Sequence, residues 1–307
     1  MAKKSLNLAG VIPPMPTPFD SKGALAADQL SSNVKVWNEF GLRGMLVLGS
    51  NGEFVMMSAD EKIRAVEAVK ASIAPDKLLL AGTGCSTTEE TIAVSKRAQA
   101  AGADALLVLH PHYYKSLMTD EALRGFFFKV ADAVDVPVLV YNMPGCTGMD
   151  LSAKLLIELA SHENIIGWKD SGSNIVKMEA VVKAKGDDFQ LLIGSASLLL
   201  PALSIGAVGG IMALANIAPA ECIKLIELFG SGNVAAAREL QLNMTPVNNA
   251  VTATYAMPGL KHVMHQLGLY GGPCREPILP LGEKEAGQLD ALIRDAGIRP
   301  FRTTAKA

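Results

Sequence analysis

One lysine follows a strongly apolar segment near the middle of the chain, and a tyrosine ends the apolar segment before it. Lys169 directly follows IIGW, and Tyr141 closes PVLVY. Lysine is rarely buried without a partner. It either extends to solvent along its aliphatic stem or occupies a desolvated site that favours the neutral amine. A neutral amine attacks carbonyl carbon and forms a Schiff base. Tyr141 alone is more typical of an aromatic that packs at the rim, but beside Lys169 its phenol could carry protons.

Other polar residues also follow apolar runs. The segment Gly49–Glu53 reads GSNGE, in which glycines flank small donors that could approach a carboxylate. A plain tight turn is the alternative interpretation. His110 and His112 form an H-x-H pair, but no third ligand stands out, so we expect no metal. The glycines of AVGGIM could bind phosphate, but they suit close packing equally well, and we prefer that interpretation.

Eight apolar runs alternating with helical patterns must position these residues. Runs that are apolar at every position are typical of parallel strands buried on both faces. The pattern predicts an α/β fold, a (β/α)₈ TIM barrel over residues 1–230, followed by a C-terminal helical extension over 231–307. An open doubly wound sheet is the alternative, but the first run leads into PPMPTPF rather than G-x-G-x-x-G. The runs are centred near Val11, Leu46, Leu79, Leu107, Leu139, Ile166, Leu192 and Ile211.

Local signals place several helix ends. Ser58 to Glu61 and Thr87 to Glu90 each fit a capping box, which predicts that helices start there. In the extension we expect loops at MPGL and YGGPCREP, and helices over Asn233–Met244, Leu260–Gly268 and Glu283–Ala296.

The composition excludes several classes of protein. Of 307 residues, 50% are hydrophobic and 19% charged, which excludes intrinsic disorder. The formal net charge of −2 provides no basic surface for nucleic acid, and the apolar runs are far shorter than the roughly 20 residues of a membrane span. Four scattered cysteines indicate neither a disulfide framework nor a zinc site. Without a signal-like apolar region, we expect a cytoplasmic protein.

These motifs together resemble the pyruvate-dependent Schiff-base aldolase superfamily, which includes dihydrodipicolinate synthase and N-acetylneuraminate lyase. The segments that carry the resemblance are GSNGE, YNMPGCTG, GWKDS and GAVGGI. The resemblance implies that Lys169 forms an imine with a 2-oxo acid and that Tyr141 carries protons. It also implies that Ser50 and Asn51 hold the substrate carboxylate, that Ile211 lines the pocket, and that Tyr113 packs at a subunit interface of a homotetramer built from two dimers.

One position departs from dihydrodipicolinate synthase. Those enzymes typically carry an arginine where this chain has Cys146, and a neutral thiol cannot form the bidentate pair that an arginine forms with a carboxylate. Other segments, including HPHYYK, WKDSGS and MPGLKHVMHQLGLYGGPCREP, look like 4-hydroxy-2-oxoglutarate aldolase. The serine of that enzyme that corresponds to Ser171 contacts the substrate. MPGCTG departs from its more usual VPANTG.

We therefore expect a class I lyase that cleaves or forms a C–C bond of a 4-hydroxy-2-oxo acid without cofactor or metal. The favoured reaction converts 4-hydroxy-2-oxoglutarate to pyruvate and glyoxylate. The alternatives are dihydrodipicolinate synthase, using pyruvate and aspartate semialdehyde, and a 2-keto-3-deoxy sugar acid aldolase. A catalytically idle keto-acid-binding protein is the non-enzyme alternative.

Overall fold

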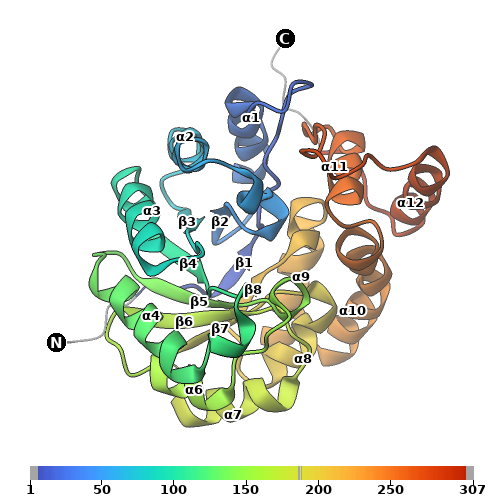
Figure 1. Cartoon of the computed structure of the whole chain (residues 1–307). Helices are drawn as coiled ribbons and strands as arrows, with labels where there is room; N and C mark the ends of the chain where they lie inside the picture. Colours follow the sequence, from blue (N-terminus) through green and yellow to red (C-terminus); the bar gives the residue numbers. More distant parts are fainter. Residues whose placement is uncertain (1–5, 186, 188, 302–307) are drawn as a thin grey trace.

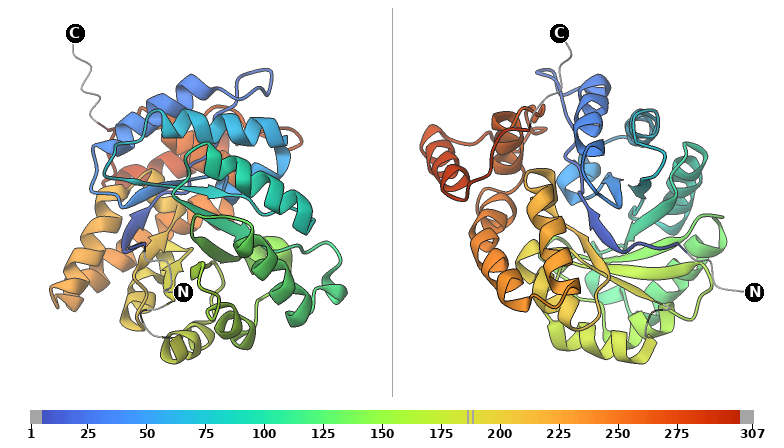
Figure 2. Two further views of the ribbon diagram at one scale, coloured as in Figure 1. Left: turned by 90° about the vertical axis from the view of Figure 1, so that its left-hand side faces the viewer. Right: turned by 180° about the vertical axis from the view of Figure 1, so that it is seen from behind.

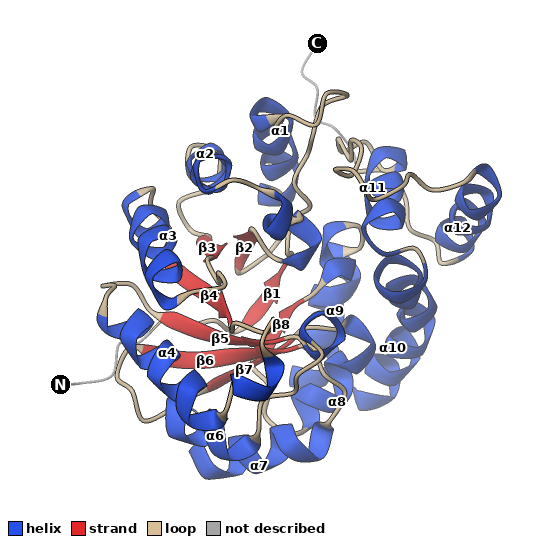
Figure 3. Cartoon of the chain, in the orientation of Figure 1, coloured by secondary structure: helices blue, strands red, loops and turns tan. Residues whose placement is uncertain are grey.

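A computed structural model describes residues 6–301 except 186 and 188. Its eight strands are parallel and form one sheet in the order β1-β8-β7-β6-β5-β4-β3-β2. They lie at the centre of the molecule, with helices around them (Figures 1 and 3). The strands are β1 Gly10–Ile12, β2 Gly44–Val47, β3 Leu78–Gly82, β4 Ala105–Leu109, β5 Val138–Asn142, β6 Ile165–Asp170, β7 Gln190–Ile193 and β8 Gly209–Ile211.

The sheet closes on itself between β1 and β2. The Met15 amide donates to the Leu46 carbonyl at 2.9 Å, and the Leu46 amide donates to the Pro13 carbonyl at 3.0 Å. These bonds and a parallel bridge between Pro14 and Leu46 join the first two strands. The predicted (β/α)₈ barrel is confirmed. Its strands are apolar throughout because both faces are covered, one by the barrel interior and the other by helices.

Helices that surround the barrel follow the strands along the chain. Ser58 and Glu61 form the predicted capping box at the start of α2. At the start of α3, the Thr87 hydroxyl accepts from the Glu90 amide at 3.1 Å. The helices are α1 Ala27–Asn38, α2 Ala59–Lys70, α3 Thr88–Ala100, α4 Asp120–Asp132, α5 Pro144–Thr147, α6 Ala153–Leu159, α7 Ile175–Lys185, α8 Leu199–Ser204 and α9 Pro219–Gly230, with short 3-10 turns at Ser50–Gly52, Phe54–Met56, Lys115–Leu117, Ala196–Leu198 and Ala213–Asn216.

The C-terminal segment is helical, as predicted, and lies along one flank of the barrel (Figure 2). It comprises α10 Val234–Asn249, a π-helical turn at Ala250–Thr254, α11 Ala256–Gln266 and α12 Glu283–Asp295. Helix α10 packs along α9. The division of the chain at residue 230 stays a prediction.

Two local predictions in this segment are wrong. Helix α10 continues to Asn249 with Pro246 inside it, five residues beyond the expected end. The MPGL segment is not a loop but part of the first two turns of α11. Pro258 lies at the third position of that helix, where a backbone N–H has no partner within the helix, so proline is tolerated there. Among the described residues, no helix has the length and apolar character needed to cross a membrane.

Candidate active site

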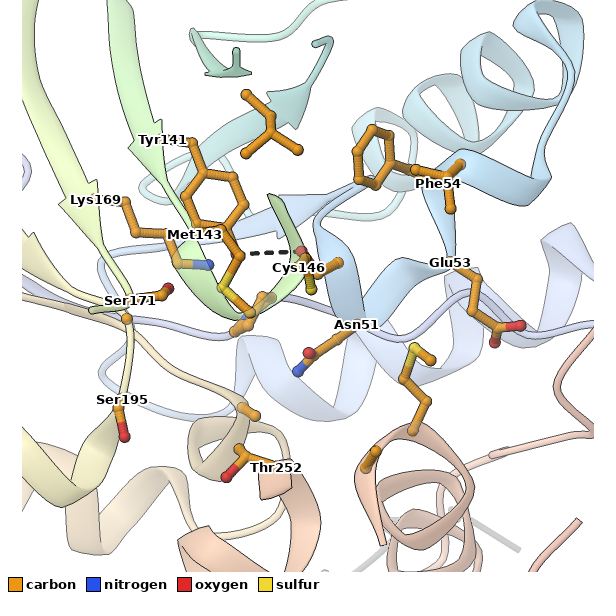
Figure 4. A pocket seen from close by; sticks show the side chains of 18 of the residues that line it. Asn51, Glu53, Phe54, Tyr141, Met143, Cys146, Lys169, Ser171, Ser195 and Thr252 are labelled. Carbon is orange, nitrogen blue, oxygen red and sulfur yellow. Dashed lines mark hydrogen bonds between the residues drawn. The ribbon is translucent and has the colours of Figure 1, made fainter. Parts of the chain in front are cut away.

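A cavity of about 500 Å³ opens where the strands of the barrel end (Figure 4). Its walls come from the segments after several strands and from the C-terminal segment. The residues that line it are Pro14, Ser50, Asn51, Glu53, Phe54, Val55, Met56, Leu109, His112, Tyr141, Met143, Cys146, Lys169, Ser171, Gly194, Ser195, Ala213, Val251, Thr252, Ala253, Ala256, Met257 and Ile278.

Lys169 and Tyr141 lie side by side at this opening. They are direct partners in the register of β5 and β6, and each is only 3% exposed. The Lys169 Nζ lies 4.3 Å from the centroid of the Tyr141 ring, and Figure 4 shows both side chains directed into the same space. The expected adjacency of the amine and the phenol is confirmed.

Ser50 extends this pair to the segment after β2. Its Oγ lies 3.2 Å from the Tyr141 Oη, at hydrogen-bond distance. Asn51 lines the same cavity, and none of the described residues forms a hydrogen bond with its buried Nδ2. A buried donor without a partner is costly, so this amide is available to an acceptor on a bound molecule.

The turn that carries Ser50 and Asn51 has an unusual backbone. Leu48 and Glu53, on either side of it, adopt φ angles of 62° and 52°, which are uncommon for residues with side chains. A Cβ atom at Gly82 would lie 2.0 Å from the Leu48 carbonyl oxygen, so only glycine allows β3 to approach this turn. Such backbone persists where surrounding contacts hold it, and it often occurs at functional sites.

A buried ionic cluster holds the far end of this turn. The Glu53 carboxylate, fully buried, lies 2.5 Å from the Nζ of Lys261, whose side chain is 2% exposed. The Arg275 amide donates to Glu53 Oε2 at 2.8 Å, and the Arg275 guanidinium pairs with Glu61 of α2. The turn is thus fixed by residues more than 200 positions away in the sequence.

Of the other predicted site residues, some line the cavity and some do not. Ser171 lines the cavity, and its amide donates to the Asn142 carbonyl at 2.9 Å. Ile211 is fully buried in β8 and is not among the described residues that line the cavity. Tyr113 is 83% exposed, and the single chain does not bring it to the cavity. Its expected place at a subunit interface stays a prediction.

Cys146 lies on the segment after β5, together with Met143, and both line the cavity. Partial desolvation of the thiol raises the pKa of Cys146 above its ordinary value, although the positive charge of Lys169 acts in the opposite direction. The thiol is therefore neutral near pH 7.

Sequence reasoning missed the contribution of the C-terminal segment. Val251, Thr252 and Ala253 of the π-helical turn, Met257 of α11 and the later Ile278 form one wall of the cavity. The available signal was the similarity of MPGLKHVMHQLGLYGGPCREP to known aldolases. That similarity indicated that the segment matters for function, but not that it lies beside the cavity. In the part of the chain that the structure describes, no group of three or more potential ligands is arranged for a metal ion.

Comparisons with known proteins agree with this arrangement. The sequence profile of the dihydrodipicolinate synthetase family matches residues 7–296. The chain belongs to this family. An uncharacterized DapA-like lyase of Halobacterium salinarum is 34% identical over 95% of both chains. The 4-hydroxy-tetrahydrodipicolinate synthase of Methanothrix thermoacetophila is 32% identical over 93% of this chain and 96% of that enzyme.

A solved structure of the dihydrodipicolinate synthetase family has the same fold. YagE, a prophage protein of E. coli K12 crystallised in complex with pyruvate, superposes with a TM-score of 0.90 at 30% identity, over 95% of this chain and all of YagE (100%). Members of the family are pyruvate-dependent class I aldolases and lyases that act through a Schiff base. The chain is therefore an enzyme of this class.

Proposed function

We propose that this enzyme cleaves a 4-hydroxy-2-oxo acid to pyruvate and an aldehyde through an imine on Lys169. The observation that carries the proposal is the buried Lys169 beside the Tyr141 ring, with the Tyr141 hydroxyl 3.2 Å from Ser50. The phenol beside the Lys169 amine supplies an acid and base within reach of the reacting atoms.

The reaction follows from the chemistry of these groups. The Lys169 amine attacks the C2 ketone of the substrate, and water leaves with proton transfer by Tyr141. The protonated imine then accepts electrons as the C4 hydroxyl loses its proton and the C3–C4 bond breaks. The aldehyde departs, the enamine is protonated at C3, and water hydrolyses the imine to release pyruvate and the free amine. The imine itself is the electron sink, so the sequence of steps needs neither metal nor cofactor.

Ser50, Asn51 and Ser171 bind the substrate in this proposal. Ser50 and Asn51 receive the carboxylate next to the ketone, and the unpartnered Asn51 Nδ2 supports this role. Ser171 faces the same cavity from the segment after β6 and contacts the remainder of the substrate.

The substrate that the sequence resemblance favours is 4-hydroxy-2-oxoglutarate, which yields pyruvate and glyoxylate. The second candidate is condensation of pyruvate with aspartate semialdehyde, because several relatives are named 4-hydroxy-tetrahydrodipicolinate synthase. Cys146 argues against this condensation, because it replaces the arginine that those enzymes typically carry and a thiol cannot form the bidentate pair that an arginine forms with a carboxylate. Turnover of both substrates, and of a 2-keto-3-deoxy sugar acid, measured side by side, separates these reactions.

Borohydride trapping tests the shared mechanism. The protein is incubated with pyruvate and sodium borohydride, digested, and mapped by mass spectrometry, with Lys169→Met as the matched control. We expect one reduced pyruvate adduct, located on Lys169 and lost in the variant. An unmodified Lys169, or an adduct that persists in Lys169→Met, contradicts the mechanism. Exchange of the pyruvate methyl hydrogens with solvent distinguishes an enzyme from an idle binding protein.

A further inference from the structure

A second polar cluster lies directly behind the proposed catalytic pair. Asn142 follows Tyr141, and Asp170 follows Lys169; the two are partners in the register of β5 and β6 and are fully buried. Successive side chains of a strand point to opposite faces. Asn142 and Asp170 therefore face the surrounding helices, whereas Tyr141 and Lys169 face the cavity.

Lys177 of α7 supplies the cation of this cluster. Its Nζ lies 3.0 Å from the Asp170 Oδ2 and also pairs with Asp150. The Lys177 side chain is 7% exposed and Asp170 is fully buried, whereas Asp150 is 41% exposed. The Asn142 Nδ2 donates to the Asp150 Oδ1 at 2.7 Å and to both Asp170 oxygens at 3.1 Å. One ammonium and one amide thus hold two carboxylates together.

The cluster anchors the ends of two segments that form the cavity. The Leu151 amide donates to the Asn142 Oδ1 at 3.0 Å, which fixes the far end of residues 143–150. The Gly172 amide donates to the Asp170 Oδ1 at 2.8 Å, which fixes the segment after β6. We call residues 143–150 the β5 loop; it carries Met143 and Cys146 into the cavity wall.

We propose that Lys177 is a positioning residue that holds the β5 loop against the ends of β5 and β6, and so sets the part of the cavity that receives the aldehyde portion of the substrate. The assignment of that portion rests on the proposed function. Lys177 does not line the cavity, and its effect passes through Asp150, Asp170 and Asn142.

Lys177 can hold the β5 loop in place because the two carboxylates share it as their one cation. Without Lys177, Asp150 and Asp170 would repel each other around the single Asn142 amide, and a buried carboxylate that loses its cation is strongly unfavourable. Asp150 is the more exposed of the two, so it would move toward water and take the β5 loop with it. Displacement of a substrate-positioning group by about 1 Å can cost about a hundredfold in rate.

Two variants test the proposal. Lys177→Met removes the cation, and Asp150→Asn removes only the partly exposed carboxylate while Lys177 keeps Asp170. The matched control is Lys154→Met, which breaks a more exposed pair with Glu158 on α6. Each protein is compared with the wild type by hydrogen–deuterium exchange of residues 143–151, by borohydride trapping of pyruvate, and by kinetics with 4-hydroxy-2-oxoglutarate.

We expect faster exchange across the β5 loop and a KM raised about tenfold or more in Lys177→Met, with a smaller change in Asp150→Asn and none in Lys154→Met. Trapping of pyruvate on Lys169 should stay at the wild-type rate, because the strands hold Lys169 and Tyr141. Unchanged exchange in both variants overturns the proposal. Faster exchange with an unchanged KM also overturns it, because the cluster would then serve stability alone.

The outcomes remain separable from those of the proposed function. If Lys177→Met does not fold, Asp150→Asn decides, since its remaining Lys177–Asp170 pair is intact. If the wild type forms no pyruvate adduct on Lys169, the proposed function fails, and the exchange comparison alone decides whether Lys177 holds the β5 loop. Alkylation of the Cys146 thiol by iodoacetamide gives an independent measure of how firmly the β5 loop is held. We expect it to be faster in Lys177→Met.

Discussion

The Tyr141 hydroxyl has one serine oxygen within hydrogen-bond distance, Ser50 Oγ at 3.2 Å, and faces the space beside the Lys169 amine. Tyr141→Phe keeps the ring that packs beside the Lys169 Nζ but removes the proton donor. We expect kcat to fall about 10²–10⁴-fold, the usual contribution of acid–base catalysis. Ser50→Ala should cause a smaller loss. The measurement is steady-state cleavage together with borohydride trapping, and a kcat unchanged in Tyr141→Phe excludes Tyr141 as the proton carrier.

Cys146 offers a test of substrate choice. In Cys146→Arg, a guanidinium at the cavity can pair with a carboxylate of the second substrate. A hydrogen bond to a charged group contributes about 1.5–3 kcal/mol, so the preference for aspartate semialdehyde over an uncharged aldehyde should rise about tenfold or more. Competition assays measure the ratio of kcat/KM values. Cys146→Ala is the control, and a ratio equal in both variants shows that residue 146 does not contact that carboxylate.

At the level of single residues, the sequence was informative where a polar group interrupts an apolar run. Lys169 and Tyr141 could be paired because parallel strands end at the same edge. Lys261 and Arg275 carry no such signal, since a lysine within an amphipathic helix and an arginine in a loop are most often exposed. Their burial depends on Glu53 and Glu61, which are distant in the sequence.

Among the elements, the C-terminal segment and the turn after β2 are joined by the Glu53–Lys261 pair. Lys261→Met leaves the buried Glu53 carboxylate without its cation, which typically costs 3–5 kcal/mol. We expect a loss of about 3 kcal/mol or more in the free energy of unfolding. Urea unfolding measures it, with Lys224→Met as the control, because the Lys224–Glu227 pair is exposed and such pairs contribute about 0–1 kcal/mol. Equal losses in the two variants contradict a specific role for the Glu53–Lys261 pair.

The contact between α2 and the segment after α11 predicts that the stability of the fold depends on pH. The hydrogen bond from Arg275 lowers the pKa of Glu61 from 4.5 to about 2. A carboxyl group with a lowered folded-state pKa stabilises the fold fully above its unfolded pKa and loses that effect as pH falls. The wild type should therefore lose stability between about pH 4.5 and pH 2. Glu61→Gln should be less stable at pH 7 and should lose less across that window in urea unfolding; identical pH profiles contradict the prediction.

Helices and strands differed in how well their ends could be predicted. The strands were located because short runs that are apolar at every position, alternating with helical patterns, are typical of parallel strands buried on both faces. The start of α11 was missed because Pro258 and Gly259 have weak helix propensity, and packing against the rest of the fold overrides it. Gly259 is buried, with no room for a Cβ beside Tyr255, which explains the glycine there.

For the whole molecule, the exposed aromatic surface between β4 and α4 predicts assembly. Tyr113, Tyr114 and Leu117 are 83%, 67% and 66% exposed, and exposed apolar patches mark interaction surfaces. We expect a homotetramer, with a sedimentation mass about four times the 32.3 kDa of the chain. Tyr113→Phe should keep this mass and lower kcat, as the family resemblance implies. A monomeric mass, or an unchanged kcat in a tetrameric Tyr113→Phe, contradicts the predicted interface role.

The sequence by itself determined the barrel, the positions of its strands and the pairing of Lys169 with Tyr141, because each depends on a local pattern of apolar and polar residues. Only the tertiary structure decided that residues 250–257 form a wall of the cavity, that Glu53 depends on Lys261, and that Lys177 joins Asp150 to Asp170. These contacts join elements whose spatial relation is set by how helices pack around a closed barrel. The sequence alone does not show whether a lysine extends into water or pairs with a buried carboxylate, because the packing of the helices determines which residue lies beside it.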